Sequence, residues 1–135
     1  MDLFALRLEP GQDLKQSLQQ FTQARGLLAG FILTAVGSLE QVALRLAGAH
    51  SPTIYTATFE IVSLVGTLCP TGLHLHLAVA DHQGQTWGGH LLEGCIVYTT
   101  AEIVVGTSAS FTFTRETDRA TGYLELKVTP SCENL

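Results

Sequence analysis

Two alternating stretches, residues 73–80 and 86–91, joined by a short polar turn, constrain the fold of this chain most strongly. Asp81 suits the first position of a type I turn, and Gly84 suits the left-handed position that follows it. If Asp81 pairs with Gln85, the two stretches form an antiparallel hairpin whose register follows by counting back from the turn. One face of this predicted hairpin is a core face, which carries Leu73, Leu75, Leu77, Val79, Trp87, Gly89 and Leu91.

The opposite face of the predicted hairpin carries three histidines. His74 and His76 are two residues apart, so in a strand they lie on the same face, about 6.6 Å apart along the backbone. The register places His90 directly opposite His76 and diagonally across from His74. Three neutral imidazoles that converge from two strands predict a divalent metal site for zinc, with a fourth position open. The alternative is an exposed sheet face with three solvated or hydrogen-bonded histidines. The convergence depends on the turn, since a slip of one residue there would move His90 to the opposite face.

The low charge content predicts that part of the surface is buried in an oligomer. Only 14% of the 135 residues are charged, against about 25% in a typical domain, and 46% are hydrophobic. A single domain of this size has few polar side chains with which to cover its surface. The net charge is −5 and the 7 Lys and Arg residues are scattered, so direct binding to nucleic acid is not expected.

The cysteines predict a reducing compartment. Cys69, Cys95 and Cys132 are odd in number and have no CxxC spacing, which favours reduced thiols in a cytoplasmic protein. Cys95 begins an apolar strand, where a small buried residue is its simplest role. Residues 2–9 already alternate like a strand, so no signal peptide is expected. No apolar run is long and regular enough for a membrane helix, so no membrane association is expected.

The remaining chain predicts an α+β fold: a mostly antiparallel, twisted β-sheet with one main α-helix in a single domain, residues 1–135. The helix has Asp13 as its N-cap, Gly26 as its C-terminal stop and an apolar stripe of Leu14, Leu18, Phe21 and Ala24. Glu40 and Gln41 are expected to form a turn between two apolar strands, residues 30–39 and 42–47. The predicted strands besides the hairpin are 3–8, 30–39, 42–47, 55–68, 95–105, 110–115 and 123–128.

Carboxylates inside apolar strands are the candidates for catalytic work. Glu60 and Glu102 either face solvent, form a pair, or have a role in the site. Glu102 could orient an imidazole N–H beside the metal, or equally cap a contact between subunits. Glu93 follows His90 and is expected to be an ordinary edge carboxylate. His50 lies in a loop that a neighbouring subunit could bring to the site.

The order of these segments resembles the plant-and-prokaryote conserved (PPC) domain. The resemblance rests on residues 29–39 (AGFILTAVGSL), 59–68 (FEIVSLVGTL), 74–78 (HLHLA) and 88–94 (GGHLLEG), and extends from about residue 3 to 128. It implies the α+β fold, a homotrimer, and metal binding by His74, His76 and His90, as in prokaryotic members. The family's DNA-binding label derives from AT-hook segments of plant members. Their Arg-Gly-Arg core is absent here, because Arg25-Gly26 is followed by Leu27.

Three functions remain open from the sequence. The first is a homotrimeric zinc-binding module that takes a small ligand at the metal and has a regulatory or ligand-binding role. The second is a zinc-dependent enzyme of hydrolase or lyase type that uses metal-bound water, with Glu60 and Glu102 as candidate acid–base groups. The third is a DNA-associated regulatory protein, as the family label suggests.

Overall fold

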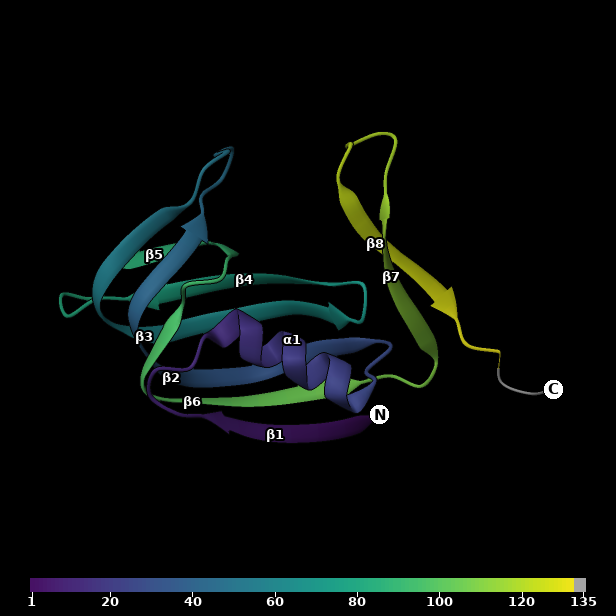
Figure 1. The fold of residues 1–135 in the computed structure, drawn as a ribbon, viewed down its shortest axis with the longest axis horizontal. Helices are drawn as coiled ribbons and strands as arrows, with labels where there is room; N and C mark the ends of the chain where they lie inside the picture. The colour runs from purple at the N-terminus through teal and green to yellow at the C-terminus, as the bar shows by residue number, and fades with distance from the viewer. Residues whose placement is uncertain (133–135) are drawn as a thin grey trace.

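The structure is a computed structural model and describes residues 1–132. Within them, one helix and eight strands follow in the order β1, α1, then β2 to β8 (Figure 1). Their bounds are β1 Asp2–Leu8, α1 Leu14–Arg25, β2 Gly30–Arg45, β3 Thr53–Cys69, β4 Gly72–Ala80, β5 Thr86–Leu91, β6 Ile96–Thr107, β7 Phe111–Thr117 and β8 Leu124–Pro130. The α+β prediction, a mostly antiparallel sheet with one helix, is confirmed. No helix in this part of the chain is long and apolar enough to cross a membrane.

Helix α1 begins and ends as the sequence predicts. The Asp13 side chain accepts a hydrogen bond from the Gln16 backbone N–H at 2.9 Å, and Gly26 adopts the left-handed conformation, with φ 59°. The prediction that Ala24 extends the buried stripe is wrong, since Ala24 is exposed and Thr22 is buried instead. Thr22 satisfies its hydroxyl by donating to the Leu18 carbonyl at 2.8 Å, which makes its burial tolerable.

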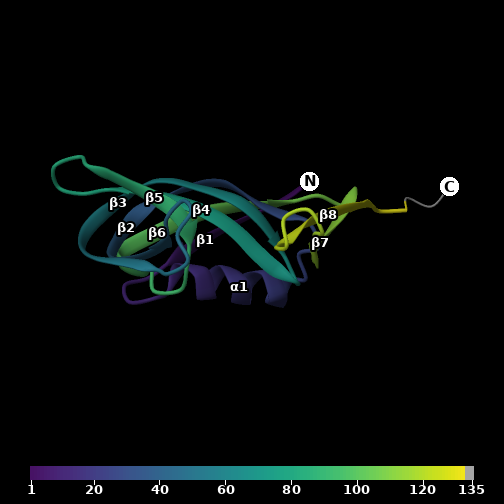
Figure 2. The same ribbon diagram turned by 90° about the horizontal axis from the view of Figure 1, so that it is seen from above.

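A six-stranded antiparallel sheet in the order β1-β6-β2-β3-β4-β5 lies over α1, which covers one face (Figure 2). Strand β2 also pairs with β5, so strands β2 to β5 curl round on themselves. The core lies between the curled sheet and the helix. Its largest fully buried side chains are Leu14, Leu18, Leu39, Leu44, Leu68, Leu77, Leu91, Ile103, Val42, Val79, Val97 and Val105.

The expected turn at Glu40-Gln41 is wrong, because β2 is one continuous strand. The pairing with β3 shifts register between Leu39 and Gln41, and so does the pairing with β6. This irregularity is a β-bulge, which bends a strand without ending it. The Gln41 side chain donates to the Gly94 carbonyl at 3.0 Å and so finds a partner within the fold. The bend lets the last residues of β2 reach β5.

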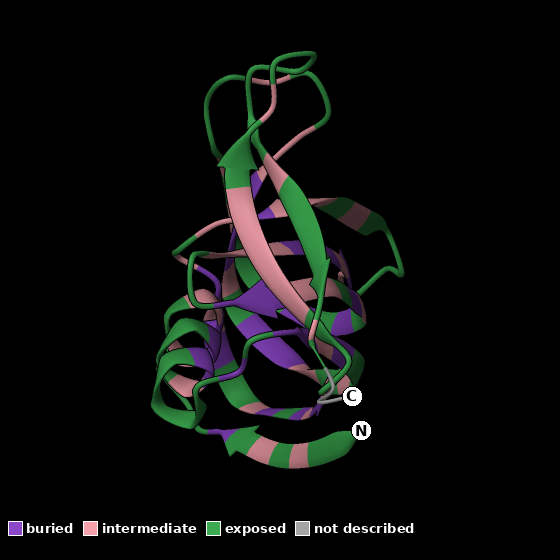
Figure 3. Cartoon of the chain, turned by 90° about the vertical axis from the view of Figure 1, so that its right-hand side faces the viewer, coloured by how far each residue is buried: buried purple, intermediate pink, exposed green. Residues whose placement is uncertain are grey.

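Strands β7 and β8 form a separate two-stranded sheet, hereafter the arm, that projects from the main sheet (Figure 1). Two backbone donors attach it: Phe113 donates to the Leu28 carbonyl at 2.8 Å and Arg115 to the Thr71 hydroxyl at 2.9 Å. Most of β7 is half-buried, whereas β8 is mostly exposed (Figure 3). The bond to Thr71 places the arm beside the turn between β3 and β4, close to the start of β4, which carries His74 and His76.

Candidate metal centre

The hairpin of β4 and β5 has the predicted register. His76 pairs with His90, Ala78 with Gly88 and Ala80 with Thr86. The Asp81 backbone donates to the Gln85 carbonyl at 2.9 Å, and the Asp81 carboxylate accepts from the backbone N–H of Gln85, also at 2.9 Å. These bonds hold the turn, so the slip that would have carried His90 to the core face does not occur.

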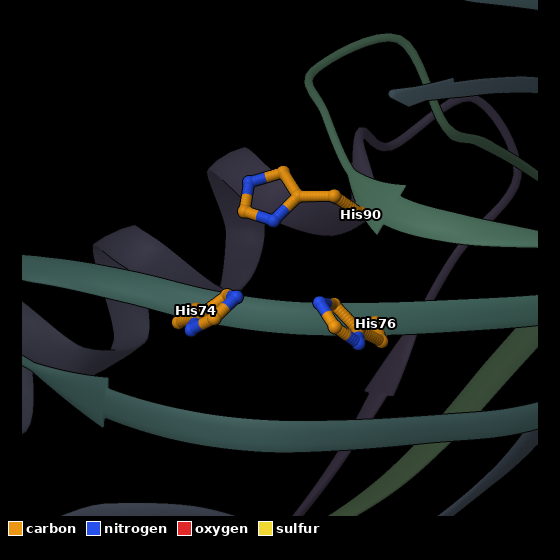
Figure 4. Close-up of side chains that lie close together, drawn as sticks. All are labelled: His74, His76 and His90. Carbon is orange, nitrogen blue, oxygen red and sulfur yellow. The ribbon is translucent and has the colours of Figure 1, made fainter. Parts of the chain in front are cut away.

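The three imidazoles come together on the outer face of the hairpin, opposite the core (Figure 4). Ring centroids are 5.0 Å apart for His74 and His76, 5.1 Å for His74 and His90, and 5.9 Å for His76 and His90. One nitrogen of each ring lies within 4.8 Å of the others. In Figure 4 a ring nitrogen of His90 points toward the gap between the other two rings.

These residues fit a divalent metal ion. Metal–imidazole bonds are about 2.0–2.1 Å long, so an ion among three nitrogens at this spacing requires each to move by less than about 1 Å. His90 Nδ1 is buried and has no hydrogen-bond partner among the described residues. A buried nitrogen without a partner is costly in a protein interior, and a metal ion would satisfy its lone pair.

The environment keeps two of the ligands neutral. Burial, followed by the positive charge of Arg45, lowers the pKa of His90 to about 4. Burial, followed by the charge of Arg115, lowers the pKa of His74 as well. Metal ligation requires the unprotonated ring, so these rings are ready to bind without first losing a proton at neutral pH.

Two glycines let neighbouring strands approach the histidine hairpin closely. A Cβ on Gly89 would lie 2.8 Å from the Arg45 carbonyl oxygen, because β2 pairs with β5 directly beside this residue. A Cβ on Gly66, whose φ is +143°, would overlap the carbonyl oxygen of His74 on the adjacent strand. Glycine at these positions therefore determines how closely β3 and β2 hold the two histidine-bearing strands.

A cavity of about 660 Å³ opens beside His74 and His90. Sequence reasoning missed several of its wall residues. Arg45 is opposite His90 in the β2–β5 pairing, and Arg115, Tyr123 and Glu125 come from the arm. No local motif marks them, since they lie tens of residues from the histidines along the chain. The cavity is lined by Arg45, Gly48, Ala49, His50, Thr71, Gly72, Leu73, His74, His90, Arg115, Gly122, Tyr123, Leu124 and Glu125.

The structure does not bring the candidate carboxylates to this place. Glu60 pairs with Ala80 at the far end of β4, and Glu102 lies on β6, where it pairs with Val36 of β2 and does not line the cavity. Glu93 accepts a hydrogen bond from the Gln16 side chain of α1 at 3.4 Å. His50, by contrast, lines the cavity within the same chain.

The fold and the site together define a class: a single-helix, antiparallel β-sheet protein with three histidines on the outer face of one hairpin. The chain belongs to the Plants and Prokaryotes Conserved (PCC) domain family, whose sequence profile matches residues 1–109. The matched region ends just before β7, so the arm lies beyond it.

The chain is similar to proteins from bacteria and archaea. It is 56% identical over 126 residues to a protein of Synechococcus sp. named "Bifunctional protein GlmU", covering 93% of this chain and 20% of that protein. The chain thus spans about a fifth of the length of this curated relative. A solved structure of a hypothetical protein from Salmonella is 46% identical, with a TM-score of 0.93, covering 96% of this chain and 94% of that one. The structure of a metal-containing protein from Archaeoglobus fulgidus is 24% identical, with a TM-score of 0.78 and coverage of 93% and 92%, and shares the fold.

Proposed function

We propose that this chain, as one PPC domain over residues 1–135, is a metal-binding module that holds zinc through His74, His76 and His90. The observation that carries the proposal is the buried, unpartnered Nδ1 of His90 beside two further imidazoles. Three neutral nitrogen ligands suit zinc. The metal-containing relative from Archaeoglobus fulgidus supports the choice of a metal, and this chain's own residues supply the ligands.

The proposed role is binding of a small ligand, with a regulatory or carrier function. A bound zinc ion with three protein ligands supplies a Lewis-acidic position to which a ligand can bind. Around that position the chain contributes the cavity wall, two arginines and a hydrophobic rim. We place ligand binding ahead of catalysis, because Glu60 and Glu102 do not line the cavity beside the histidines. We also place it ahead of DNA association, because the net charge is −5.

We further propose that the chain assembles as a homotrimer in the cytoplasm. The sheet face turned away from α1 carries exposed apolar side chains, among them Val36, Val62 and Val65. An exposed apolar face of this kind is typical of a subunit interface. The number three comes from the family resemblance, and the compartment from the odd set of unpaired cysteines, Cys69, Cys95 and Cys132.

Zinc binding by the purified protein tests the proposal. Dialysed protein loaded with zinc is expected to hold about one ion per chain by elemental analysis, and His76→Ala is expected to lose it. His82→Ala is the matched control, because His82 is exposed at the tip of the same hairpin and is not part of the cluster. Absence of zinc from the wild-type protein, or equal zinc content in His76→Ala, would refute the metal site.

A further inference from the structure

We propose that the cavity beside the histidines binds an organic carboxylate, with Arg45 and Arg115 as its anion-binding residues. The proposal deepens the function given above and rests on it for the position of the metal. The cavity, the two arginines and their surroundings do not depend on the metal. They supply the evidence that follows.

Arg115 is held against the cavity wall by the body of the protein. Its Nη2 donates to the Thr67 hydroxyl at 2.6 Å, and Thr67 is the residue that pairs with His74 across β3 and β4. The Nε of Arg115 is buried and has no hydrogen-bond partner among the described residues. A guanidinium has five N–H donors in a planar fork, so this one has a buried donor unused. Arg115 also lines the cavity, where an acceptor can bind its guanidinium.

Arg45 provides the second positive charge. It pairs with His90 in the β2–β5 register, and directly paired residues of an antiparallel pair project from the same face. Its side chain is half-buried, as is that of Arg115. Between residues 1 and 132 the structure has one ion pair, Lys127 with Glu116, so neither arginine is neutralised by a carboxylate.

The charge of the cavity favours one anion. Arg45 and Arg115 both line it, and so does one carboxylate, that of Glu125. Glu125 accepts a hydrogen bond from the Thr121 hydroxyl at 3.0 Å, which directs one of its oxygens to the tip of the arm. The charges of these three side chains sum to one positive charge. A half-buried, unpaired positive charge is stabilised by a bound anion.

The walls favour an organic carboxylate over an inorganic ion. A cavity of about 660 Å³ is far larger than an inorganic anion and is the size of an organic-ligand site. Leu73, Tyr123 and Leu124 supply apolar surface around the two cations. A guanidinium fork matches the two oxygens of a carboxylate. The site therefore suits a ligand with a carboxylate at one end and an apolar body.

Calorimetric titration of the zinc-loaded protein with benzoate tests this assignment. Benzoate is expected to bind, and benzamide, its neutral analogue of the same shape, to bind at least about tenfold more weakly. Arg115→Gln and Arg45→Gln are each expected to weaken benzoate binding by about tenfold or more, the range of a charge-assisted hydrogen bond. Arg7→Gln makes the same charge change on β1, at the opposite edge of the sheet, and is expected to leave binding unchanged.

The controls separate this proposal from the metal site. Thermal unfolding of each variant shows whether it folds. If Arg115→Gln does not fold, Arg45→Gln and Thr67→Val test the carboxylate site in its place. Thr67→Val removes only the hydroxyl that holds Arg115. Zinc bound normally with no benzoate binding would overturn the carboxylate site alone. Benzoate bound, and weakened by the arginine variants, in protein that takes up no zinc would overturn the metal site alone. Inorganic phosphate binding more tightly than benzoate, or benzamide binding equally well, would also overturn the carboxylate assignment.

Discussion

At the level of single residues, burial and neighbouring charge lower the pKa of His74 and His90. Unperturbed histidine titrates near pH 6.5, whereas His90 in this fold has a pKa of about 4 because of burial and then of Arg45. The shift has two consequences. The imidazole is neutral and ready to bind a metal near pH 7, and the folded state resists the protonation that the unfolded chain accepts.

The pH dependence of stability follows from the direction of this shift. Between pH 6.5 and about 4 the unfolded chain binds a proton at His90 that the folded chain does not. The metal-free protein is therefore expected to lose stability as the pH falls through this window, with no such loss above pH 6.5. His90→Gln is expected to flatten the dependence, measured as the melting temperature in EDTA from pH 7 to 4. Equal slopes for wild type and variant, with His82→Gln as control, would contradict the assignment.

Cys95 shows the same effect of burial on a residue outside the site. It is fully buried, its thiol donates to the Ala43 carbonyl at 3.3 Å, and burial raises its pKa to about 11. A thiol that stays protonated in this way is a poor nucleophile and a poor metal ligand. The prediction that Cys95 acts as a small buried residue is thus confirmed.

At the level of strands, two adjacent glycines of β5 have different roles. Gly89 lies beside the pairing of β2 with β5, and a Cβ there would meet the Arg45 carbonyl oxygen at 2.8 Å. Gly88 has room, since its nearest contacts with an added Cβ would be 3.4 Å or longer. Of these two positions, only Gly89 must be glycine for β5 to pair with β2.

These two positions allow a paired test. Gly89→Ala is expected to lower the free energy of unfolding by about 1–3 kcal/mol, because β2 or β5 must shift, and to weaken zinc binding, because His90 follows directly. Gly88→Ala is expected to stay within about 0.5 kcal/mol of wild type. Urea unfolding and zinc titration measure both effects. A Gly89→Ala protein as stable as Gly88→Ala would show that the space between residue 89 and the Arg45 carbonyl accommodates a methyl group, contrary to this prediction.

At the level of the whole molecule, the exposed surface is larger than that of a typical monomer. The accessible area is 7905 Å², whereas a folded chain of 14.5 kDa is expected to expose about 6,900 Å². Two features contribute: the projecting arm and the open sheet face. Val36 is 55% exposed on that face, and Val104 is half-buried beside it, opposite Thr34.

Charged substitutions on the open face are expected to dissociate the proposed trimer. Val36→Glu leaves the core intact, because Val36 is largely exposed in the single chain, and Val104→Glu acts at its neighbour. Light scattering is expected to show a trimer for wild type and for Gln19→Glu, on the exposed side of α1, and a smaller species for the two valine variants. If the site is shared between subunits, zinc affinity falls with dissociation. A monomeric wild type would refute the assembly, and a monomeric variant with normal zinc binding would refute only the shared site.

The charge distribution argues against direct contact with DNA. The net charge of −5 leaves no excess of cations to neutralise phosphates. Fluorescence anisotropy with an AT-rich duplex is expected to detect no complex at physiological salt. A salt-sensitive complex of micromolar affinity would contradict this prediction and favour the DNA-associated function.

The sequence by itself determined the features that depend on interactions between residues close together in the chain. The register of β4 and β5 followed from a four-residue turn and a period of two, so the amino-acid order alone placed His74, His76 and His90 together. The helix boundaries followed in the same way from Asp13 and Gly26. Each of these depends on residues close in the chain, whose geometry is governed by local hydrogen bonds.

Only the tertiary structure decided what surrounds the histidines. Arg45 reaches His90 because a bulge bends β2 toward β5, and Arg115 reaches His74 because the arm docks against β3 and β4. Glu102 lies away from the hairpin because it pairs with Val36, nine residues before Arg45 along β2. Alternation within one strand says which face a residue occupies, but not which distant strand lies beside it. That choice is made by sheet closure, whose energetics depend on packing among residues far apart in the chain.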